Sequence, residues 1–373
     1  MVDCLVGLQW GSEGKGKIAS YLSCEYNAMV RSGGPQAGHT FYKDGERLVN
    51  RQLPCGLNNL LYIASNSLIN LDVLVEELVR YELYPDRVMV DNHAMVIRDE
   101  HREKEQELSR LISSTGEGVG SAQVAKLMRE GRLFDSYAIE DPELYLYCGD
   151  TVEMIHRQIS LGHNILIEGT QGFGLSLNHG TYPYVTSRDV TASSLLSDAG
   201  IPPDYHTGTI GVLRTYPIRV AGNSGPTESE EISWEEIARR SGYSHVPSEY
   251  TTVTGRLRRV FEQNIDELKR AVMVNRPSQL ALTFIDYVNY EDYGKVDIGS
   301  LSGKSRSYID WIEDELEVPV TFVGTGEESI IDLREGRVRA EMVEMFPDFY
   351  GKGWENAARF IERKLDHKPR IFR

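Results

Sequence analysis

The chain opens with a short apolar run that leads directly into a glycine-rich loop, and this junction limits the folds that the sequence can adopt. Residues 2–8 (VDCLVGL) are typical of a buried strand. Residues 11–17 (GSEGKGK) form the glycine-rich stretch, and a helical pattern follows from Lys17 to Cys24. A strand, a glycine-rich turn and a helix in this order present backbone N–H groups and a helix N-terminus to phosphate. The junction therefore predicts a phosphate-binding loop in an α/β fold.

The loop matches the phosphate-loop pattern except at its last position. Gly11, four further residues and then Gly16 and Lys17 fit the pattern, which normally ends in a Ser or Thr that binds magnesium. Ile18 occupies that position here, so a magnesium ion would need protein ligands elsewhere. Loose glycine–lysine matches are usually simple turns. It is the strand before the loop and the helix after it that favour a phosphate site.

Strand and helix patterns alternate along the rest of the chain. Strands are expected at residues 26–31, 87–90, 164–168, 280–286 and 318–323, and helices around residues 71–78, 152–159, 261–272 and 354–365. This alternation predicts an α/β fold with a large, mainly parallel sheet flanked by helices. No internal repeat and no Pro/Gly/Ser-rich linker divides the sequence, so we expect one domain over residues 1–373.

Composition narrows the class of protein. The 40 basic and 56 acidic residues give a formal charge of −16, which argues against a dedicated nucleic-acid-binding protein. The four cysteines show no metal-ligand spacing, so reduced thiols are expected. Residues 1–10 show neither a basic start nor a cleavable apolar stretch, so no secretion signal is expected. No apolar run reaches the ~18 residues of a membrane span. We therefore expect a cytoplasmic protein without membrane or nucleic-acid partners.

Two further glycine-rich loops carry candidate site residues. In residues 32–40 (SGGPQAGHT), His39 could act as a general acid or donate to a phosphate oxygen. Residues 168–187 begin at the end of an expected strand, where the ligand sites of α/β proteins lie. Gln171 in this third loop could hold a base or a phosphoryl oxygen. The simpler interpretations are a surface histidine in a turn and a long surface loop.

Charged residues mark the last candidate segments. Residues 253–259 (VTGRLRR) carry Arg256 and Arg258, whose guanidinium groups suit carboxylates and phosphates. The simpler interpretation is a solvated basic face, but a basic cluster is informative in so acidic a chain. Asp286 closes one expected strand, and residues 324–326 (GTG) end the next. A carboxylate at a strand end can accept from N1–H and the 2-amino group of guanine, although a helix cap or a turn would explain it too.

Together these segments resemble the adenylosuccinate synthetase family. The matching segments are QWGSEGKGKI, AGHT, STGEGVG (residues 114–120), EGTQG, HGTYPYVTS, TGRLRR and LTFID, in family order over most of the chain. The resemblance implies a large, mainly parallel sheet with phosphate-loop-like features, and a homodimer. It also implies that IMP and L-aspartate are joined with GTP and Mg²⁺. The oxygen at purine C6 is a poor leaving group, so it is first phosphorylated and then displaced by the aspartate amine.

The resemblance further implies roles for individual residues. The catalytic set would be Ser12, Lys15, His39 and Gln171, with Lys15 and Gln171 on the transferring phosphoryl group and His39 as the acid. Mg²⁺ would be bound by Ser12 and Gly38. The nucleoside monophosphate would contact Ser12, Gln36, Ala37, Thr115, Lys126, Gln171, Thr186 and Arg256. The nucleoside triphosphate would contact Glu13, Gly14, Lys15, Gly16, Lys17, Gly38, His39, Thr40, Arg258, Asp286, Gly324, Thr325 and Gly326. Aspartate would contact Val253, Thr254, Arg256 and Arg258. Lys126 stands where an arginine usually reaches into the partner subunit's site.

Several residues depart from the family pattern around the purine and the donor nucleotide. Ser12 replaces an aspartate that removes the N1 proton of IMP and binds magnesium, and a neutral hydroxyl is a poor base. Gln36 replaces an asparagine, Glu117 an arginine, and Phe284 a lysine of the guanine-reading strand. Because His39 is retained, these departures indicate altered substrates rather than lost catalysis.

A serine at position 12 resembles a bacteriophage branch of the family that serves diaminopurine genomes. The resemblance to that branch implies dGMP as substrate, N6-succino-2-amino-2′-deoxyadenylate as product and ATP or dATP as donor, in the host cytoplasm. Asp286 favours GTP as donor, whereas Phe284 and Ser12 favour the adenine nucleotides. Two alternatives stay open: an ordinary GTP-dependent adenylosuccinate synthetase acting on IMP, and a nucleotide-binding protein without catalysis.

Overall fold

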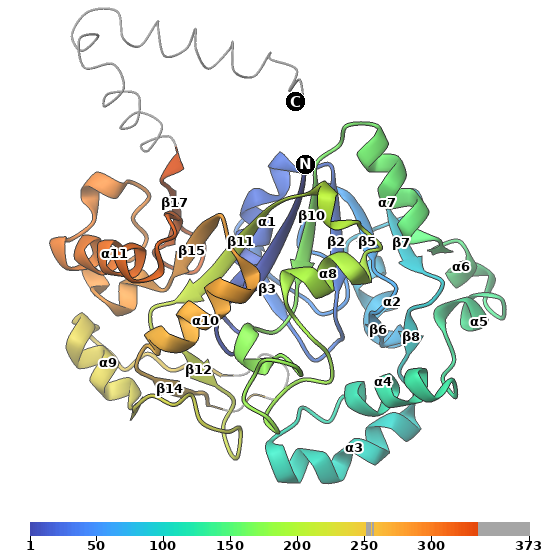
Figure 1. Cartoon of the computed structure of the whole chain (residues 1–373), viewed down its shortest axis with the longest axis horizontal. Coiled ribbons are helices and arrows are strands. Elements are labelled where there is room, and N and C mark those ends of the chain that lie inside the picture. Colours follow the sequence, from blue (N-terminus) through green and yellow to red (C-terminus); the bar gives the residue numbers. More distant parts are fainter. Residues whose placement is uncertain (251–254, 256, 335–373) are drawn as a thin grey trace, which may run out of the picture. The chain divides into compact units, whose positions relative to one another are not determined.

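A ten-stranded sheet forms the centre of the computed structural model, which describes residues 1–250, 255 and 257–334 (Figure 1). The strand order is β17-β16-β15-β11-β1-β10-β2-β5-β7-β9, and every pairing from β16 to β9 is parallel. The strands are β1 (Val2–Gly7), β2 (Ala28–Ser32), β5 (Leu60–Ile63), β7 (Val88–Asp91), β9 (Cys148–Gly149), β10 (Ile165–Gly169), β11 (His206–Arg214), β15 (Gln279–Thr283), β16 (Val320–Gly324) and β17 (Ile330–Asp332). The expected α/β fold with a large, mainly parallel sheet is confirmed.

Helices flank the sheet on both faces. They are α1 (Lys15–Leu22), α2 (Leu71–Arg80), α7 (Thr151–Ser160), α8 (Ala192–Asp198), α10 (Ile265–Asn275) and α11 (Gly303–Leu316). Helix α1 carries the chain from β1 past β10 to β2, and α8 carries it from β10 past β1 to β11, in the opposite direction along the sheet. Because such crossovers are right-handed, α1 and α8 lie on opposite faces. None of the described helices combines the length and the apolar character that a membrane crossing needs.

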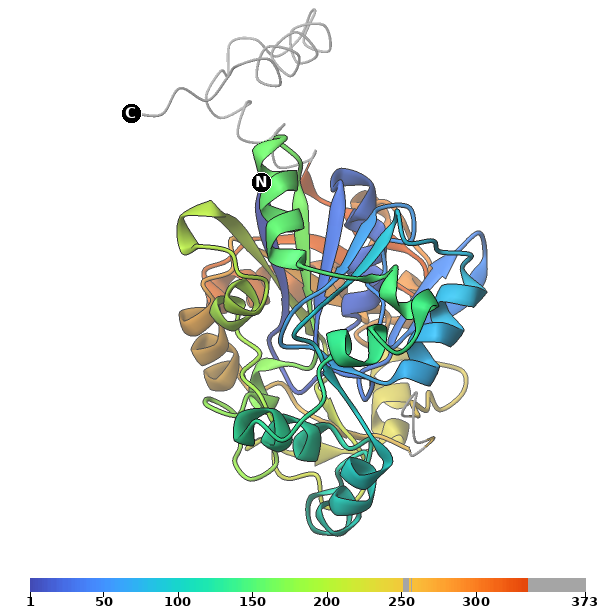
Figure 2. The ribbon, with the colours of Figure 1, turned by 90° about the vertical axis from the view of Figure 1, so that its right-hand side faces the viewer.

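Smaller elements surround the sheet, several of them beyond the carboxyl ends of its strands, at the bottom of Figure 1 and Figure 2. The helices are α3 (Asp99–Ile112), α4 (Val119–Met128), α5 (Phe134–Ala138), α6 (Pro142–Tyr145) and α9 (Trp234–Ser241). The small sheets are β12 (Ile218–Arg219) with β14 (Arg259–Phe261) and β13 (Glu231–Ile232), the hairpin β3 (His39–Lys43) with β4 (Glu46–Asn50), and β6 (Leu68–Ile69) with β8 (Met95–Val96). The carboxyl edge of the sheet is where α/β proteins place their ligands.

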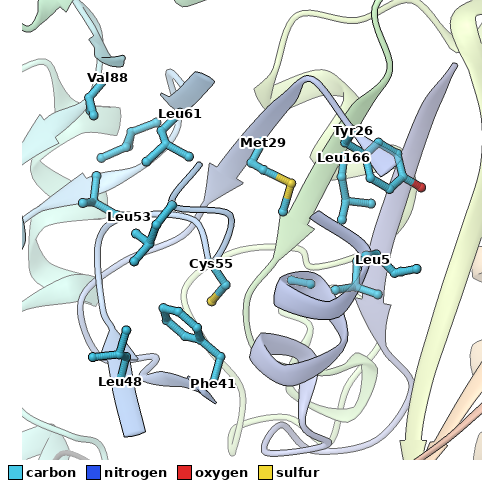
Figure 3. Close-up of a cluster of buried hydrophobic side chains, with 14 of the residues drawn as sticks. Leu5, Tyr26, Met29, Phe41, Leu48, Leu53, Cys55, Leu61, Val88 and Leu166 are labelled. Carbon is cyan, nitrogen blue, oxygen red and sulfur yellow. The ribbon is translucent and has the colours of Figure 1, made fainter. Parts of the chain in front are cut away.

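The main apolar core joins the sheet to the β3-β4 hairpin (Figure 3). Leu5 and Leu166 come from the sheet, and Phe41 and Leu48 come from the hairpin. Phe41 is 1 % exposed and Leu48 is 8 % exposed. Burying such a side chain stabilises the fold by about 1.5–3 kcal/mol, so the core holds the hairpin firmly against the sheet. His39 is the first residue of β3, and its position is therefore set by this packing.

Two element boundaries differ from the expectations. The expected helix at residues 261–272 is wrong at its start, because Phe261 ends β14 and the side chain of Asn264 caps α10 by accepting from Glu267 N at 3.0 Å. The expected strand at residues 280–286 ends at Thr283, because Phe284 takes a left-handed φ of 59° and a 3₁₀ turn follows. The expected helix at 354–365 lies outside the described residues.

Chain contacts divide the protein into two units, Met1–Ile331 and Asp332–Arg373. The sheet, apart from the last residue of β17, and all the helices named above belong to the first unit. Most of the second unit lies outside the described residues. One domain over residues 1–373 therefore stays a prediction.

Candidate active site

A large cleft, of about 1370 Å³, includes residues that follow β1, β10 and β15. It brings together most of the residues that the sequence predicts for the site: Ser12, Gly14, Lys15, Gly16, Lys17, Gln36, Ala37, Gly38, His39, Thr40, Thr115, Gln171, Thr186, Arg258, Asp286 and Gly326. Glu13, Lys126, Gly324 and Thr325 are described but do not line the cleft. Val253, Thr254 and Arg256 lie outside the described residues. Segments that are far apart in the sequence thus meet in one cavity.

Buried polar atoms that have no hydrogen-bond partner among the described residues gather in the wall of this cleft. They are Gln36 Oε1, Gln123 Oε1, Gln171 Oε1, Ser187 Oγ, Asp286 Oδ1 and Trp10 Nε1. Buried polar atoms of native proteins nearly always have a partner. Their concentration here indicates that a polar ligand completes the cleft.

The phosphate loop is folded around a buried carboxylate. Glu13 Oε1 accepts from Gln9 N at 3.2 Å and from Gly11 N at 2.8 Å, and Glu13 Oε2 accepts from Lys15 Nζ at 2.6 Å. Gly14, with a φ of 89°, precedes α1, and glycine takes this conformation without strain. The Glu13 carboxylate is therefore occupied by hydrogen bonds within the loop. A contact between Glu13 and a triphosphate would have to come from the Glu13 backbone.

Ser12 lies exposed at the cleft in a left-handed conformation, with a φ of 60°. This conformation is uncommon for residues other than glycine. The carbonyl oxygen of Ser12 accepts from Arg214 Nη1 at 3.2 Å, which helps to hold the residue in place. Its hydroxyl makes no hydrogen bond to a described residue and is available to a ligand.

His39 pairs with a buried carboxylate that the sequence analysis does not single out. Glu168, in β10, accepts from the ring Nδ1 of His39, from Arg31 Nη1 at 2.9 Å and from Cys55 N at 2.8 Å. Burial alone would raise the pKa of Glu168, but His39 and Arg31 outweigh it and lower the pKa to about 2. Burial, reinforced by Arg31, lowers the pKa of His39 to about 4. An ionised Glu168 therefore orients a neutral imidazole through Nδ1–H and leaves Nε2 for other contacts.

Metal binding has two candidate places among the described residues. His39, Cys55 and Glu168 have ligand atoms within 4.8 Å of one another, but Arg31 already neutralises Glu168 and would repel a metal cation. The predicted magnesium ligands are the hydroxyl of Ser12 and the carbonyl oxygen of Gly38, and both residues line the cleft. Neutral oxygen ligands fit a magnesium ion that takes its other ligands from phosphate and water.

Asp286 and Lys17 form a second polar group in the cleft. Asp286 lies in the 3₁₀ turn after β15, where Tyr243 donates to Oδ2 and no described residue donates to Oδ1. Burial raises the pKa of Asp286 to about 6 and lowers the pKa of Lys17 to about 8. Lys17 Nζ donates to Gly326 O at 2.7 Å. Asp286 Oδ1 can therefore accept a hydrogen bond from a ligand, and the cationic Lys17 lies in the same part of the cleft.

Thr115 and Thr186 line the cleft, whereas Lys126 hydrogen-bonds to its own chain. Lys126 Nζ donates to Ser65 O and to His93 O, each at 2.7 Å, and burial lowers its pKa. Its reach into a partner subunit stays a prediction.

The residues that the sequence reasoning missed are charged side chains within buried strands. Arg31 in β2 is 1 % exposed, and Glu168 in β10 and Arg214 in β11 are 0 % exposed. A charge inside an apolar run was the available signal, because such a charge needs a buried partner. The sequence does not show which partner it has, since Arg31 and Glu168 meet only when β2 pairs with β10.

A phosphate loop after the first strand of a doubly wound sheet, beside a histidine held by a buried carboxylate, defines an α/β enzyme that acts on phosphorylated ligands. Comparison with protein families identifies the group within that class. The family model for adenylosuccinate synthetase matches residues 4–142 and 132–299. The chain belongs to the adenylosuccinate synthetase family, and it is a ligase that condenses aspartate with a purine nucleotide.

Individual relatives agree with the family. The adenylosuccinate synthetase of Methanococcus vannielii is 38% identical over 343 residues, covering 88% of this chain and 98% of that one. The enzyme of Methanocaldococcus jannaschii is 39% identical over 344 residues, covering 88% and 96%.

Two solved structures resemble the fold. Fully ligated adenylosuccinate synthetase from Plasmodium falciparum has a TM-score of 0.78 at 24% identity, covering 89% of this chain and 99% of that one. Cyanophage S-2L succinoaminodeoxyadenylate synthetase (PurZ), bound to dGMP and to dATP as an energy donor, has a TM-score of 0.73 at 31% identity, covering 89% and 95%.

Proposed function

We propose that this ligase condenses L-aspartate with C6 of dGMP, using ATP or dATP through a 6-phosphoryl intermediate, and forms N6-succino-2-amino-2′-deoxyadenylate for diaminopurine nucleotide synthesis. Ser12 carries the proposal. Its hydroxyl lines the cleft without a partner among the described residues, where the family pattern has an aspartate. The purine 2-amino group is next to N1, so a carboxylate would crowd it. Serine leaves room, and its oxygen can accept a hydrogen bond from that amino group.

The cyanophage enzyme supports this choice of substrates, because it is 31% identical and binds dGMP and dATP. Phe284 supports an adenine donor, since it removes the lysine of the guanine-reading strand. Without an aspartate at position 12, another group, such as the substrate aspartate or a water molecule, would have to take the N1 proton.

The remaining assignments belong to the same proposal. Lys15 and Gln171 hold the transferring phosphoryl group, and His39 acts on its acceptor oxygen. Ser12 and Gly38 would hold Mg²⁺, which neutralises triphosphate charge when bound. The monophosphate contacts Gln36, Ala37, Thr115, Lys126, Thr186 and Arg256. The triphosphate contacts Glu13, Gly14, Gly16, Lys17, Thr40, Asp286, Gly324, Thr325 and Gly326. Aspartate contacts Val253, Thr254, Arg256 and Arg258.

The second candidate function is an ordinary adenylosuccinate synthetase that acts on IMP with GTP. Two observations favour it. The archaeal relatives, which are 37–39% identical, are adenylosuccinate synthetases. No described residue donates to Asp286 Oδ1, so this oxygen could accept a hydrogen bond from guanine.

The experiment that separates the candidates is a matrix of IMP, dIMP, GMP and dGMP against ATP, dATP and GTP, read as aspartate-dependent phosphate release. A site with a partner for the amino group should favour dGMP over dIMP in kcat/KM by roughly 10- to 200-fold. A preference for IMP or dIMP would favour the second candidate function, an ordinary adenylosuccinate synthetase. Turnover with GTP alone would contradict ATP or dATP as the donor. Absence of aspartate-dependent release with every pair would indicate a nucleotide-binding protein without catalysis.

Two variants at position 12 distinguish the space that serine leaves for the 2-amino group from the hydrogen bond that its hydroxyl can accept. Ser12→Asp should shrink the preference for dGMP, mainly by weakening dGMP itself. Ser12→Ala keeps the space but removes the acceptor, so it should lose only the part of the preference that the hydroxyl supplies. If both variants keep the full preference, Ser12 does not select the substrate.

A further inference from the structure

Glu249 and Arg258 contact each other from either side of residues 251–256, which include three of the predicted aspartate ligands. Arg258 N donates to Glu249 O at 2.8 Å, and Tyr250 forms an antiparallel bridge with Leu257. Both Glu249 and Arg258 line the cleft. The position of Arg258 is therefore set by its pairing with the chain segment that contains Glu249 and Tyr250.

The carboxylate of Glu249 is shared between two arginines. Arg214 donates to both of its oxygens, with Nη1 at 3.1 Å from Oε2 and Nη2 close to Oε1. Arg258 Nη1 donates to Oε2 at 3.2 Å, and the hydroxyl of Tyr287 donates to Oε1 at 3.0 Å. Within the part of the chain that the structure describes, the side chain of Arg258 donates to no other residue. Its other guanidinium N–H groups can serve a ligand.

The charges of Arg214, Arg258 and Glu249 do not cancel. Two guanidinium groups share a single carboxylate, so the three side chains carry one net positive charge in the cleft wall. Burial alone would raise the pKa of Glu249, but Arg214 and Arg258 lower it, and burial lowers the pKa of Arg258. A carboxylate ligand on Arg258 would supply the missing negative charge.

Arg214 links the same group to two other parts of the cleft. Its Nη1 also donates to Ser12 O at 3.2 Å, and its guanidinium lies 3.9 Å from the centre of the Phe284 ring. Arg214 is fully buried, so its fork geometry is fixed. Glu249 thus touches Arg258 directly and the Ser12 loop through Arg214.

We propose that Glu249 is a positioning residue for the amino-acid substrate: it holds Arg258 with its remaining N–H groups open to a substrate carboxylate, and Arg214 fixes this pair to the Ser12 loop. The proposal rests on the assignment of Arg258 to aspartate in the proposed function. It predicts that Glu249 affects the affinity for aspartate although it does not touch aspartate itself.

Glu249→Gln tests the proposal, because glutamine keeps the shape but loses the charge that orients both arginines. With both nucleotides saturating, we expect the KM for aspartate to rise ~10- to 100-fold, the loss typical of a charge-assisted hydrogen bond. The KM for the nucleoside monophosphate should stay within about threefold. Glu249→Asp, which keeps the charge, should recover part of the aspartate affinity.

The matched control is Glu262→Gln. Glu262 accepts from Arg240 at 2.5 Å, and neither residue lines the cleft. This variant should leave the KM for aspartate unchanged. If Glu249 only stabilised the fold, Glu249→Gln would lower the melting temperature and kcat but leave the KM for aspartate unchanged. That result would overturn the proposal.

A second variant keeps the test decisive if Glu249→Gln does not fold. Arg214→Lys retains a positive charge but loses the fork that grips Glu249 and the contact with Ser12 O. It should also raise the KM for aspartate, and an unchanged value would overturn the proposal. Lack of aspartate-dependent phosphate release in the parent protein would contradict the proposed function instead, so the two failures are distinguishable.

Discussion

His39 shows at the scale of one residue how burial prepares a group for chemistry. Glu168 holds Nδ1 of the ring, and the packed hairpin fixes the backbone. Because the Nδ1–H of the neutral ring is held by Glu168, Nε2 is a hydrogen-bond acceptor, and His39 must take up a proton before it can act as the acid. Removing a positioned acid–base group slows turnover by ~10²- to 10⁴-fold. We therefore expect His39→Ala to lower kcat by that factor in a steady-state assay of phosphate release. His163→Ala, a histidine outside the cleft lining, should change kcat little, and a His39→Ala variant within threefold of the parent would remove His39 from the mechanism.

Asp286 makes stability depend on pH. Its pKa is raised from 3.8 to about 6 by burial, while Lys17 and the Tyr243 hydroxyl oppose the shift and Glu249 adds to it. A raised carboxyl pKa means that the folded state prefers the protonated form, so the stabilisation is complete below pH 4 and is lost as the pH rises through 6. Asp286→Asn, which is always neutral, should therefore be more stable than the parent above pH 6, by about 1–3 kcal/mol.

Urea unfolding of the parent and of Asp286→Asn at several pH values between 4 and 8 measures this difference. The gap between the two free energies of unfolding should widen with pH and then level off. A gap that stays constant over this range would show that Asp286 titrates at an ordinary pKa.

The residues of the cleft differ in how far the sequence reveals them. The segments around Ser12, His39 and Gln171 could be predicted, because glycine spacing is a local property of the chain. Glu168 and Glu249 could not, because a carboxylate acquires its role from arginines that only the folded chain brings near. Roles that depend on a local pattern are readable from sequence, and roles that depend on a distant partner are not.

At the scale of an element, the start of α10 illustrates a boundary that apolar periodicity misplaces. Phe261 continues the helical spacing of Ile265 and Leu268, yet it ends β14, and the side chain of Asn264 starts the helix. The apolar spacing of three to four residues continues from the buried strand residue into the helix. Only the N-cap residue therefore shows where the helix begins. Asn264, a residue type preferred at the N-cap, marks the start of α10 where the apolar periodicity does not.

The cap leads to a stability prediction. Asn264 Oδ1 accepts from Glu267 N at 3.0 Å, and Nδ2 donates to Thr227 O at 2.8 Å. Asn264→Ala removes both bonds and should lower the free energy of unfolding by about 0.5–2 kcal/mol, measured by urea denaturation. Asn264→Asp keeps the capping acceptor and should lose less. Equal losses in the two variants would mean that the bond to Thr227, rather than the cap, holds the start of α10.

At the scale of the whole molecule, alternating patterns predict a parallel sheet but not the order of its strands. β11 lies between β1 and β15 and pairs with both. Gly208 and Gly211 interrupt its apolar character, and no strand is expected from the sequence where the structure has a long strand near the centre of the sheet. Its partners on both sides stabilise the strand despite this weak local preference.

The outer face of α4 supports the predicted homodimer. Val124, Leu127 and Met128 are 58 %, 64 % and 61 % exposed and recur at helical spacing, so they form an apolar stripe. Exposed apolar stripes are typical of protein–protein contacts. Val124 and Leu127 also line the cleft, so a partner subunit packed on this stripe would border the site, as Lys126 on the same helix is predicted to do.

Met128→Glu tests the predicted dimer without changing a residue of the cleft lining. A charge placed in an apolar contact loses its hydration when the contact forms, so we expect the variant to sediment as a monomer at concentrations where the parent is a dimer. Val79→Glu is the control, because Val79 is 72 % exposed on α2, away from the cleft lining. A monomeric parent would contradict the homodimer. A Met128→Glu variant that stays dimeric would place the subunit contact on another face.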